Sequence, residues 1–431
     1  MDPDFGFPIL SVNLLNHIGN TVRVSGWVQR VRRLGALTFV VVRDPAGLLQ
    51  VAMDRTDERQ DLTPESVVVI RGQVVKEPRA PGGVELRHPD IEVVSLVEDV
   101  VPINLYTPAL APHLNSLLDW RPLSLRHPSQ RLIFRIQAAL AQGFRESLRE
   151  KDFVEVHTPK LIAAASEGGA DVFPVKYFEK TAYLAQSPQL YKQMMVGVFG
   201  RVFEVGPVFR AEPHATSRHL SEYVSLDAEM GFIDNHRTVM GVLRHVLDVM
   251  LTVAAHHDGE NSIEWPMVPD PIPSLHFSQA LQLISKAWGE DLGKEPDLSP
   301  ACERWLGEWA KARFGSDFLF VEGYPTSTRP FYTARDPEQP LYSNSFDLLF
   351  RGQEIVTGGQ RLHRYPDYVA ALAERGMSAQ GLEGYLRAFQ FGMPAHGGFA
   401  IGLERLTARL LGLSNIREAS LFPRDRTRLT P

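Results

Sequence analysis

A run of charged side chains lies between two apolar segments near the middle of the chain. The flanking segments, residues 203–209 and 223–230, are rich in β-forming residues, and the second alternates apolar with polar positions. This pattern predicts an antiparallel hairpin with a long charged loop. The charged side chains of the loop are Arg210, Glu212, His214, Arg218, His219 and Glu222. Because forked guanidinium groups suit phosphate oxygens, we interpret the loop as a phosphate-binding site, with a solvated hairpin tip as the alternative.

Three further polar clusters lie in the C-terminal two-thirds of the chain. They are the segment QSPQLYK at 186–192, the group Asp347, Glu354, Thr357 and Arg361, and Arg405 behind a run of glycines. Paired carboxylates supply oxygen ligands for a hard cation, and arginines neutralise the remaining charge of a phosphate chain. Together the clusters predict Mg²⁺–nucleotide chemistry on one antiparallel sheet, although each cluster alone could be an ordinary surface network.

The first 103 residues are predicted to be all-β. Short β-rich runs are separated by turn signals such as Asp44-Pro45-Ala46-Gly47. The runs span residues 21–31, 37–43, 48–53, 66–75, 83–87 and 90–96. About five strands in such a segment predict a small barrel. The first strand pair interleaves arginines with Trp27 and Phe39, which suits single-stranded nucleic acid or, alternatively, a solvated face over two core aromatics.

The rest of the chain mixes helices and strands. Residues 104–128 contain four prolines and are predicted to be a linker, and 129–431 are predicted to form the larger domain. Apolar residues at every fourth position from Leu132 to Leu148 predict an amphipathic helix. Further helices are predicted at 235–257, 299–314, 367–375 and 381–391, and strands at 153–157, 343–350 and 353–358. A strand that runs into a helix is predicted at 397–406.

Composition narrows the class of protein. The chain has 431 residues, a net charge of −6 and one cysteine, Cys302. A single cysteine excludes a disulfide framework and a Cys-rich zinc site, and it fits a reducing cytoplasm. The sequence has no run of eighteen apolar residues and no signal-peptide pattern at its start, so we expect no membrane association. An acidic protein that binds nucleic acid needs a local basic face.

The motifs resemble those of class II aminoacyl-tRNA synthetases. Residues 153–161, with Pro159, resemble motif 1, and Gly402-Leu403-Glu404-Arg405 resembles motif 3. Motif 2 resembles the two halves of the charged hairpin, Phe209-Arg210-Ala211-Glu212 and Arg218-His219-Leu220-Ser221-Glu222-Tyr223. The aspartyl subgroup is marked by Ser166-Glu167-Gly168-Gly169, QSPQLYK, Asp347 with Glu354, and Gly358-Gly359-Gln360-Arg361. The resemblance covers essentially the whole chain and is closest to the short aspartyl form typical of archaea and also found in some bacteria.

The resemblance implies an α+β protein with three parts. Residues 1–103 would be an OB-fold barrel that binds the anticodon, 104–128 a hinge, and 129–431 a catalytic antiparallel sheet flanked by helices. A homodimer would form through the helix and strand of motif 1. The implied reaction activates L-aspartate with ATP and then transfers it to the 3′-hydroxyl of tRNA(Asp). The chain would be cytoplasmic.

The family also implies a role for each site residue. Arg210 would hold the α-phosphate and the attacking carboxylate, while Arg218 and His219 hold the outer phosphates of ATP. Tyr223 and Arg405 would enclose the adenine, which Glu212 faces. The other implied ATP-binding residues are Leu220, Glu354, Gly402, Leu403 and Glu404. Asp347, Glu354 and Thr357 would organise Mg²⁺; the family more often has Ser at position 357, but the hydroxyl is kept.

The family implies that two cations select aspartate. Arg361 and Lys192 would bind its side-chain carboxylate, with Gln189 and Glu167 fixing the amino and carboxylate ends, and Arg210 and Thr357 completing the aspartate site. Asparaginyl enzymes resemble this chain but lack the lysine. Our sequence-based explanation is that a neutral amide would leave a buried ammonium without a counter-ion.

In the barrel, family resemblance implies that Phe39 stacks on an anticodon base and that Gln50 hydrogen-bonds its edge. Strict enzymes and those that also charge tRNA(Asn) differ near Gln29 and Pro78. Gln29 resembles strict enzymes and Pro78 resembles relaxed ones. We favour the hypothesis that the protein also charges tRNA(Asn), with strict aspartyl specificity as the alternative.

Three other readings stay open. An asparaginyl-tRNA synthetase is opposed by Lys192. An asparagine synthetase of this fold would lack the barrel and its basic face. A pure RNA-binding OB protein would have no use for Asp347, Glu354 and Arg405.

Overall fold

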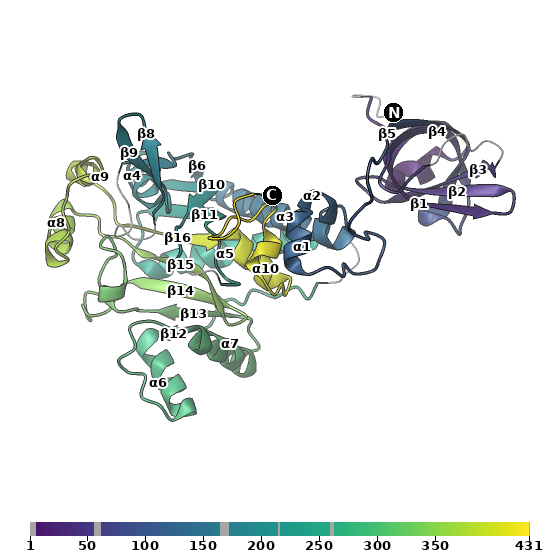
Figure 1. Ribbon diagram of the computed structural model, residues 1–431. Coiled ribbons are helices and arrows are strands. Elements are labelled where there is room, and N and C mark those ends of the chain that lie inside the picture. Colours follow the sequence, from purple (N-terminus) through teal and green to yellow (C-terminus); the bar gives the residue numbers. More distant parts are fainter. Residues whose placement is uncertain (1–5, 56–61, 164–171, 214–215, 259–262, 431) are drawn as a thin grey trace. The chain divides into compact units, whose positions relative to one another are not determined.

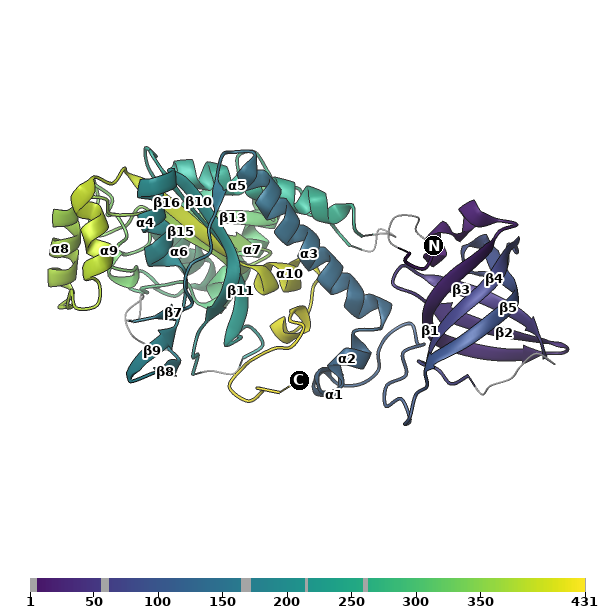
Figure 2. The ribbon, with the colours of Figure 1, turned by 90° about the horizontal axis from the view of Figure 1, so that it is seen from above.

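The computed structural model describes residues 6–55, 62–163, 172–213, 216–258 and 263–430. It divides into two compact units, residues 1–113 and 114–431. The predicted α+β class with an N-terminal barrel is confirmed. Figures 1 and 2 show the two units from perpendicular directions.

The N-terminal unit is a closed five-stranded barrel with strand order β1-β2-β3-β5-β4. Its elements are η1 (Ser11–His17), β1 (Thr21–Leu34), β2 (Leu37–Arg43), β3 (Leu48–Asp54), β4 (Val67–Lys76), η3 (Pro81–Gly83) and β5 (Val84–Ser95). Alternating valines and other aliphatic residues fill its interior. The two strands predicted at 83–87 and 90–96 are one continuous strand, β5, in which His88 takes a positive φ of 50° immediately before Pro89. Splitting this strand was therefore wrong, because the proline is accommodated at an irregularity in the β4–β5 pairing.

The larger unit is built on an eight-stranded sheet of order β12-β13-β14-β15-β16-β11-β10-β6. Its strands are β6 (Val154–Glu155), β10 (Arg201–Phe209), β11 (Glu222–Gly231), β12 (Ser274–His276), β13 (Phe318–Glu322), β14 (Ser345–Phe350), β15 (Gln353–Gln360) and β16 (His396–Gly402). The six central strands are antiparallel, as expected, whereas the edge strands β12 and β6 pair in parallel. A separate small sheet contains β7 (Leu161–Ile162), β9 (Lys180–Leu184) and β8 (Pro174–Tyr177).

Helices surround this sheet. They are α1 (Leu114–Asp119), α2 (Arg121–Ser124), α3 (Pro128–Arg149), α4 (Gln189–Phe199), α5 (His236–Ala255), α6 (Phe277–Trp288), α7 (Pro300–Phe314), α8 (Tyr365–Glu374), α9 (Glu383–Ala388) and α10 (Leu403–Leu410). Short 3₁₀ turns are η4 (Thr326–Thr328), η5 (Phe389–Phe391) and η6 (Ile416–Ala419). The stretch 104–128, predicted as a linker from its prolines, thus contains the helices α1 and α2.

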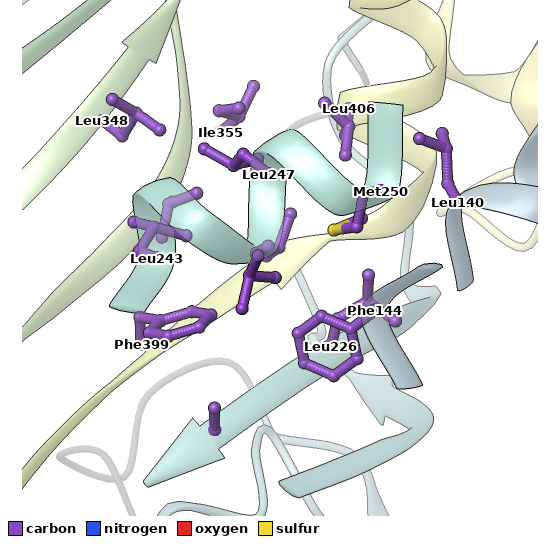
Figure 3. Close-up of a cluster of buried hydrophobic side chains, with 14 of the residues drawn as sticks. Leu140, Phe144, Leu226, Leu243, Leu247, Met250, Leu348, Ile355, Phe399 and Leu406 are labelled. Atoms are coloured by element: carbon purple, nitrogen blue, oxygen red, sulfur yellow. The ribbon is translucent and has the colours of Figure 1, made fainter. Parts of the chain in front are cut away.

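The main core lies between α3, α5, α10 and one face of the sheet (Figure 3). Phe144 of α3, Leu247 of α5 and Phe399 of β16 are all fully buried there. Gly143 allows the two long helices to approach, because a Cβ at that position would lie 2.7 Å from the Cα of Met250. α5 is long and apolar enough to cross a membrane by length and composition, but eight of its side chains are buried in this core.

The opposite sheet face carries the polar residues of the central strands. On β11, Leu226, Ala228 and Met230 belong to the core, so the alternating Ser225 and Asp227 point to the other side. α7 covers the sheet at its β13–β14 end through a second apolar cluster, and α4 packs on β10 and β11. The polar residues between α4 and α7 border the cavity described next.

Candidate active site

The charged hairpin forms one wall of a cavity of about 300 Å³. β10 and β11 pair in continuous antiparallel register from Arg201↔Met230 to Phe209↔Glu222, and the amide of Arg210 donates to the carbonyl of Ser221 just beyond. From this hairpin the cavity is lined by Arg210, Glu212, Arg218, His219, Leu220 and Tyr223. The strands are rigid because their apolar faces are buried, so the loop that they carry starts from a fixed position.

Other segments contribute the remaining predicted residues. The cavity is also lined by Gln189, Lys192, Glu354, Thr357, Arg361, Gly402, Glu404 and Arg405. Asp347 lies behind the wall, and the side chain of Leu403 packs in the hydrophobic core. Glu167 and His214 lie outside the described residues. The predicted residues that line the cavity therefore come from four separate parts of the sequence.

A buried ion network closes one end of the cavity. Lys192 on α4 lies 3.0 Å from Oδ1 of Asp227 and 3.3 Å from Oε2 of Glu229, and its Nζ also donates to the carbonyl of Phe399 at 3.3 Å. Arg361 donates from Nε to Oε1 of Glu229 at 2.9 Å. The side chains of Lys192 and Glu229 are at most 1% exposed. Burial raises the pKa of Glu229, but the charges of Arg361 and Lys192 overcome this effect and leave its pKa below the ordinary value.

This network corrects the charge argument made from the sequence. That argument required the Lys192 ammonium to lack a counter-ion unless aspartate was bound, yet Asp227 and Glu229 already pair with it. The sequence reading missed both carboxylates. A signal was present, because Ser225, Asp227 and Glu229 form an unusual polar row at every second position of β11.

Carboxylates crowd around Glu354 and Thr357, which line another part of the cavity. Asp347 on β14 pairs in register with Thr357 on β15, and the Thr357 hydroxyl donates to Oε1 of Glu354 at 3.2 Å. Burial raises the pKa of Asp347 to about 6, and the charge of Glu354 adds to this, against the opposing effect of Arg329 at 2.8 Å. Burial and the same Glu354 raise the pKa of Glu303, on α7, to about 7.

A divalent cation fits this donor set. Two carboxylates and a hydroxyl are oxygen ligands, and Mg²⁺ commonly takes one or two carboxylates and completes its shell with water and phosphate oxygens. Burial, with a smaller contribution from the charge of Glu354, raises the pKa of Asp347, and a bound cation would stabilise the ionised form of this carboxyl group. Within the described parts of the chain no three His, Cys, Asp or Glu side chains form a metal-binding group.

The residues around the predicted adenine site line the cavity but make other contacts. Arg405 donates from Nη1 to the carbonyl of Glu354 at 3.2 Å and to its Oε1 at 3.4 Å. The guanidinium of Arg210 lies 5.9 Å from the ring centre of Tyr223. The predicted enclosure of adenine by Tyr223 and Arg405 thus stays a prediction.

Glu404 is hydrogen-bonded to the second strand of the hairpin. Its two carboxyl oxygens accept from the amide of Val224 at 3.1 and 3.0 Å, and burial raises its pKa to about 7. Glu303 was missed from the sequence; it lies 3.6 Å from Arg218 and accepts from the amide of Glu354 at 3.3 Å. Arg329, also missed, lines the cavity while pairing with Asp347.

The predicted anticodon residues lie on the barrel. Phe39 is on β2 and Gln50 on β3, and both point to the same side because Gln50 pairs with Val41, two residues from Phe39. Gln50 donates from Nε2 to Glu85 at 2.9 Å. Gln29 lies at a bulge in β1, and Pro78 follows β4.

Comparison with known proteins places the chain in a family. Residues 113–426 match the family described as "tRNA synthetases class II (D, K and N)". The chain belongs to this family of class II tRNA synthetases. Residues 22–94 match the "OB-fold nucleic acid binding domain". These matches confirm the resemblance drawn from the motifs.

Several relatives of this class II synthetase are similar over nearly their whole length. It is 47% identical to the "Aspartate--tRNA(Asp/Asn) ligase" of Thermus thermophilus, over 98% of this chain and 100% of the relative. It is 40% identical to the "Aspartate--tRNA(Asp) ligase" of Pyrococcus horikoshii, over 96% and 97%. Among solved structures, asparaginyl-tRNA synthetase from Pyrococcus horikoshii has a TM-score of 0.89 at 31% identity, covering 98% of this chain and 99% of that one.

Proposed function

We propose that the chain is an aspartate–tRNA ligase. The observation that carries this function is the meeting, in one cavity, of the arginine-bearing hairpin with the buried pair Lys192 and Arg361. The end formed by the hairpin suits a nucleoside triphosphate, and the end formed by Lys192 and Arg361 suits a small anionic side chain. Its substrates are ATP, an amino acid and tRNA, and we infer that the amino acid is L-aspartate.

In the first step the aspartate α-carboxylate attacks the α-phosphorus of ATP, and pyrophosphate leaves. Displacement at phosphorus requires alignment and neutralisation of charge more than covalent help from the protein. Arg210 is assigned to the α-phosphate and the attacking carboxylate, and Arg218 with His219 to the departing pyrophosphate. In the second step the 3′-hydroxyl of tRNA attacks the aspartyl carbonyl and releases AMP.

The carboxylate end of the cavity would hold Mg²⁺ through Asp347, Glu354 and Thr357. When bound, this ion neutralises phosphate charge. The adenine would lie between Tyr223 and Arg405, near Glu212, Leu220 and the segment 402–404. Gln189 and Glu167 would hold the backbone of the amino acid.

We further propose that residues 1–103 bind the anticodon, 104–128 act as a hinge and 129–431 catalyse. Phe39 would stack on a base and Gln50 would read its edge. The active form would be a cytoplasmic homodimer joined through α3 and β6.

The two alternatives for this function differ in whether tRNA(Asn) is charged in addition to tRNA(Asp). Relatives named for tRNA(Asp/Asn) and for tRNA(Asp) alone both resemble this chain. We favour charging of both tRNAs because of Pro78, with strict specificity as the alternative suggested by Gln29.

One assay tests the function and its alternatives together. Transcripts of tRNA(Asp) and tRNA(Asn) are charged with labelled aspartate and then with labelled asparagine. We expect aspartate on both tRNAs and asparagine on neither. Aspartate on tRNA(Asp) alone would support the strict alternative, and transfer of asparagine would overturn the proposed function.

A further inference from the structure

A segment near the C-terminus lies against the hairpin loop. Residues 416–430, here called the C-terminal strap, follow α10 and contain little regular structure beyond η6. Three of its hydrogen bonds reach the loop. The amide of Ser221 donates to the carbonyl of Arg424 at 2.8 Å, the amide of Ile416 donates to the carbonyl of Ser217 at 2.9 Å, and Nη1 of Arg426 donates to the carbonyl of Pro213 at 2.9 Å.

The strap is held equally firmly on its other side. The buried guanidinium of Arg121, on α2, donates to the carbonyls of Leu421, Ser420 and Glu418 at 2.8, 2.7 and 3.1 Å. Gln137 of α3 donates to the carbonyl of Ala419 at 2.8 Å. These donors fix the backbone of the strap to helices that do not touch the cavity.

A local turn gives the end of the strap its shape. Oδ1 of Asp425 accepts from the amides of Thr427 and Arg428 at 2.7 and 2.9 Å, while its Oδ2 lies 2.7 Å from Nε of Arg417. The turn directs Arg428 to Asp119 at 2.6 Å, at the end of α1. Arg426, in the same turn, reaches the hairpin loop. One turn therefore connects the first helix of the larger unit with the loop.

The loop needs such support because the backbone hydrogen bonds between the two strands of the hairpin end at Arg210 and Ser221. Beyond this pair, other contacts must position the cations of the loop if they are to bind phosphates productively. Among the described residues, the ion pair of Arg218 with Glu303 supports one side of the loop, at 3.6 Å. The strap supports the other side through shorter hydrogen bonds.

We propose that the C-terminal strap is a positioning element for nucleotide binding, and that Arg426 and Arg428 are its positioning residues. Within the strap, Ile416 lines the cavity, but Arg426 and Arg428 do not. The strap sets the loop so that Arg210, Arg218 and His219 face the phosphates. This inference rests on the proposed function for the identity of the nucleotide.

The test uses the full chain with Arg426→Ala and Arg428→Ala. Loss of one such hydrogen bond is expected to raise the KM for ATP about tenfold in aspartate-dependent ATP–pyrophosphate exchange. The KM for aspartate and the melting temperature should stay near those of the unaltered protein. Arg426→Lys retains a donor and should recover part of the loss. The matched control is Arg387→Ala, an exposed arginine on α9, which should change nothing.

A second measurement separates this inference from the proposed function. Hydrogen exchange of peptides covering residues 203–232 needs no turnover, and both strap variants should exchange faster at 216–222 without added substrate. If the unaltered protein shows no aspartate-dependent exchange, the function fails while the strap is still tested by this readout. Unchanged ATP affinity with unchanged hydrogen exchange, or a loss of stability that lowers all kinetic constants together, would overturn the inference.

Discussion

The ammonium of Lys192 lies 3.0 Å from Oδ1 of Asp227, and both side chains are almost fully buried. With Glu229 and Arg361 they form two cations and two carboxylates, a set without net charge among the described residues. An incoming aspartate therefore competes with carboxylates already present. Selection of aspartate then depends on how these four side chains share their hydrogen bonds and not on one unpaired ammonium.

Replacing Lys192 tests this arrangement. We expect Lys192→Leu to lower kcat/KM for aspartate in pyrophosphate exchange by orders of magnitude, because Asp227 and Glu229 then repel the substrate carboxylate. Removing one partner of a buried pair also costs about 3–5 kcal/mol of folding stability. The double variant Lys192→Leu/Asp227→Leu should regain stability without regaining activity. Aspartate activation unchanged in the single variant would refute the assignment.

Gly398 provides a steric test of the same network. Its carbonyl accepts from Arg361 at 3.1 Å, and a Cβ there would lie 2.1 Å from Oε2 of Glu229. Gly398→Ala should therefore displace Glu229 and Arg361 and abolish aspartate activation. Gly241→Ala is the control, because nothing lies within 4 Å of its added Cβ on α5. It should keep activity and stabilise the helix by about 0.5–1 kcal/mol in urea unfolding.

The buried Glu404 predicts a pH dependence of stability. Burial raises its pKa in the folded chain to about 7, above its ordinary value of 4.5. Between these values the folded state binds more protons than the unfolded state, so the contribution of Glu404 is complete below 4.5 and is lost as pH rises through 7. The loss is on the order of 3 kcal/mol.

The measurement compares urea unfolding of the unaltered protein and of Glu404→Gln at pH 5 and pH 8. A glutamine oxygen can still accept from the amide of Val224. We expect the variant to gain stability relative to the unaltered protein as pH rises. If the two proteins differ in free energy of unfolding by the same amount at both pH values, the raised pKa of Glu404 is contradicted.

Variants on the barrel test the anticodon assignment. Phe39→Ala should lower the rate of tRNA charging about tenfold or more, because stacking of a base on an aromatic ring is worth about 1–3 kcal/mol. Pyrophosphate exchange without tRNA should be unaffected. Thr21→Ala, at the exposed start of β1, serves as the comparison for a change on the barrel that removes no aromatic ring. Equal effects of Phe39→Ala on charging and on exchange would argue against an anticodon role.

Local sequence patterns predicted much of this fold. β10, β11 and α3 were predicted within a few residues because each has a clear period of apolar positions. β5 was misread because Pro89 is a usual strand terminator, and only its pairing with β4 accommodates it. α1 and α2 were missed because they are too short for a periodic signal.

The site was predictable where motifs are contiguous. Arg210, Arg218 and His219 follow each other in one loop, whereas Asp227 is recognisable as a partner of Lys192 only after the chain has folded across thirty-five positions. Glu303 and Arg329 come from segments with no recognisable motif. The C-terminal strap was missed for a similar reason, since it is held mostly by hydrogen bonds between its backbone carbonyls and donors far away in the sequence.

The strap has a consequence for the order in which the protein matures. Arg426 bonds a carbonyl that precedes it by 213 positions. During synthesis the hairpin thus leaves the ribosome long before the residues that position its loop. The strands can pair early, but the nucleotide site can take its final form only when translation has passed the strap. A nascent chain would carry the catalytic arginines without the geometry to use them.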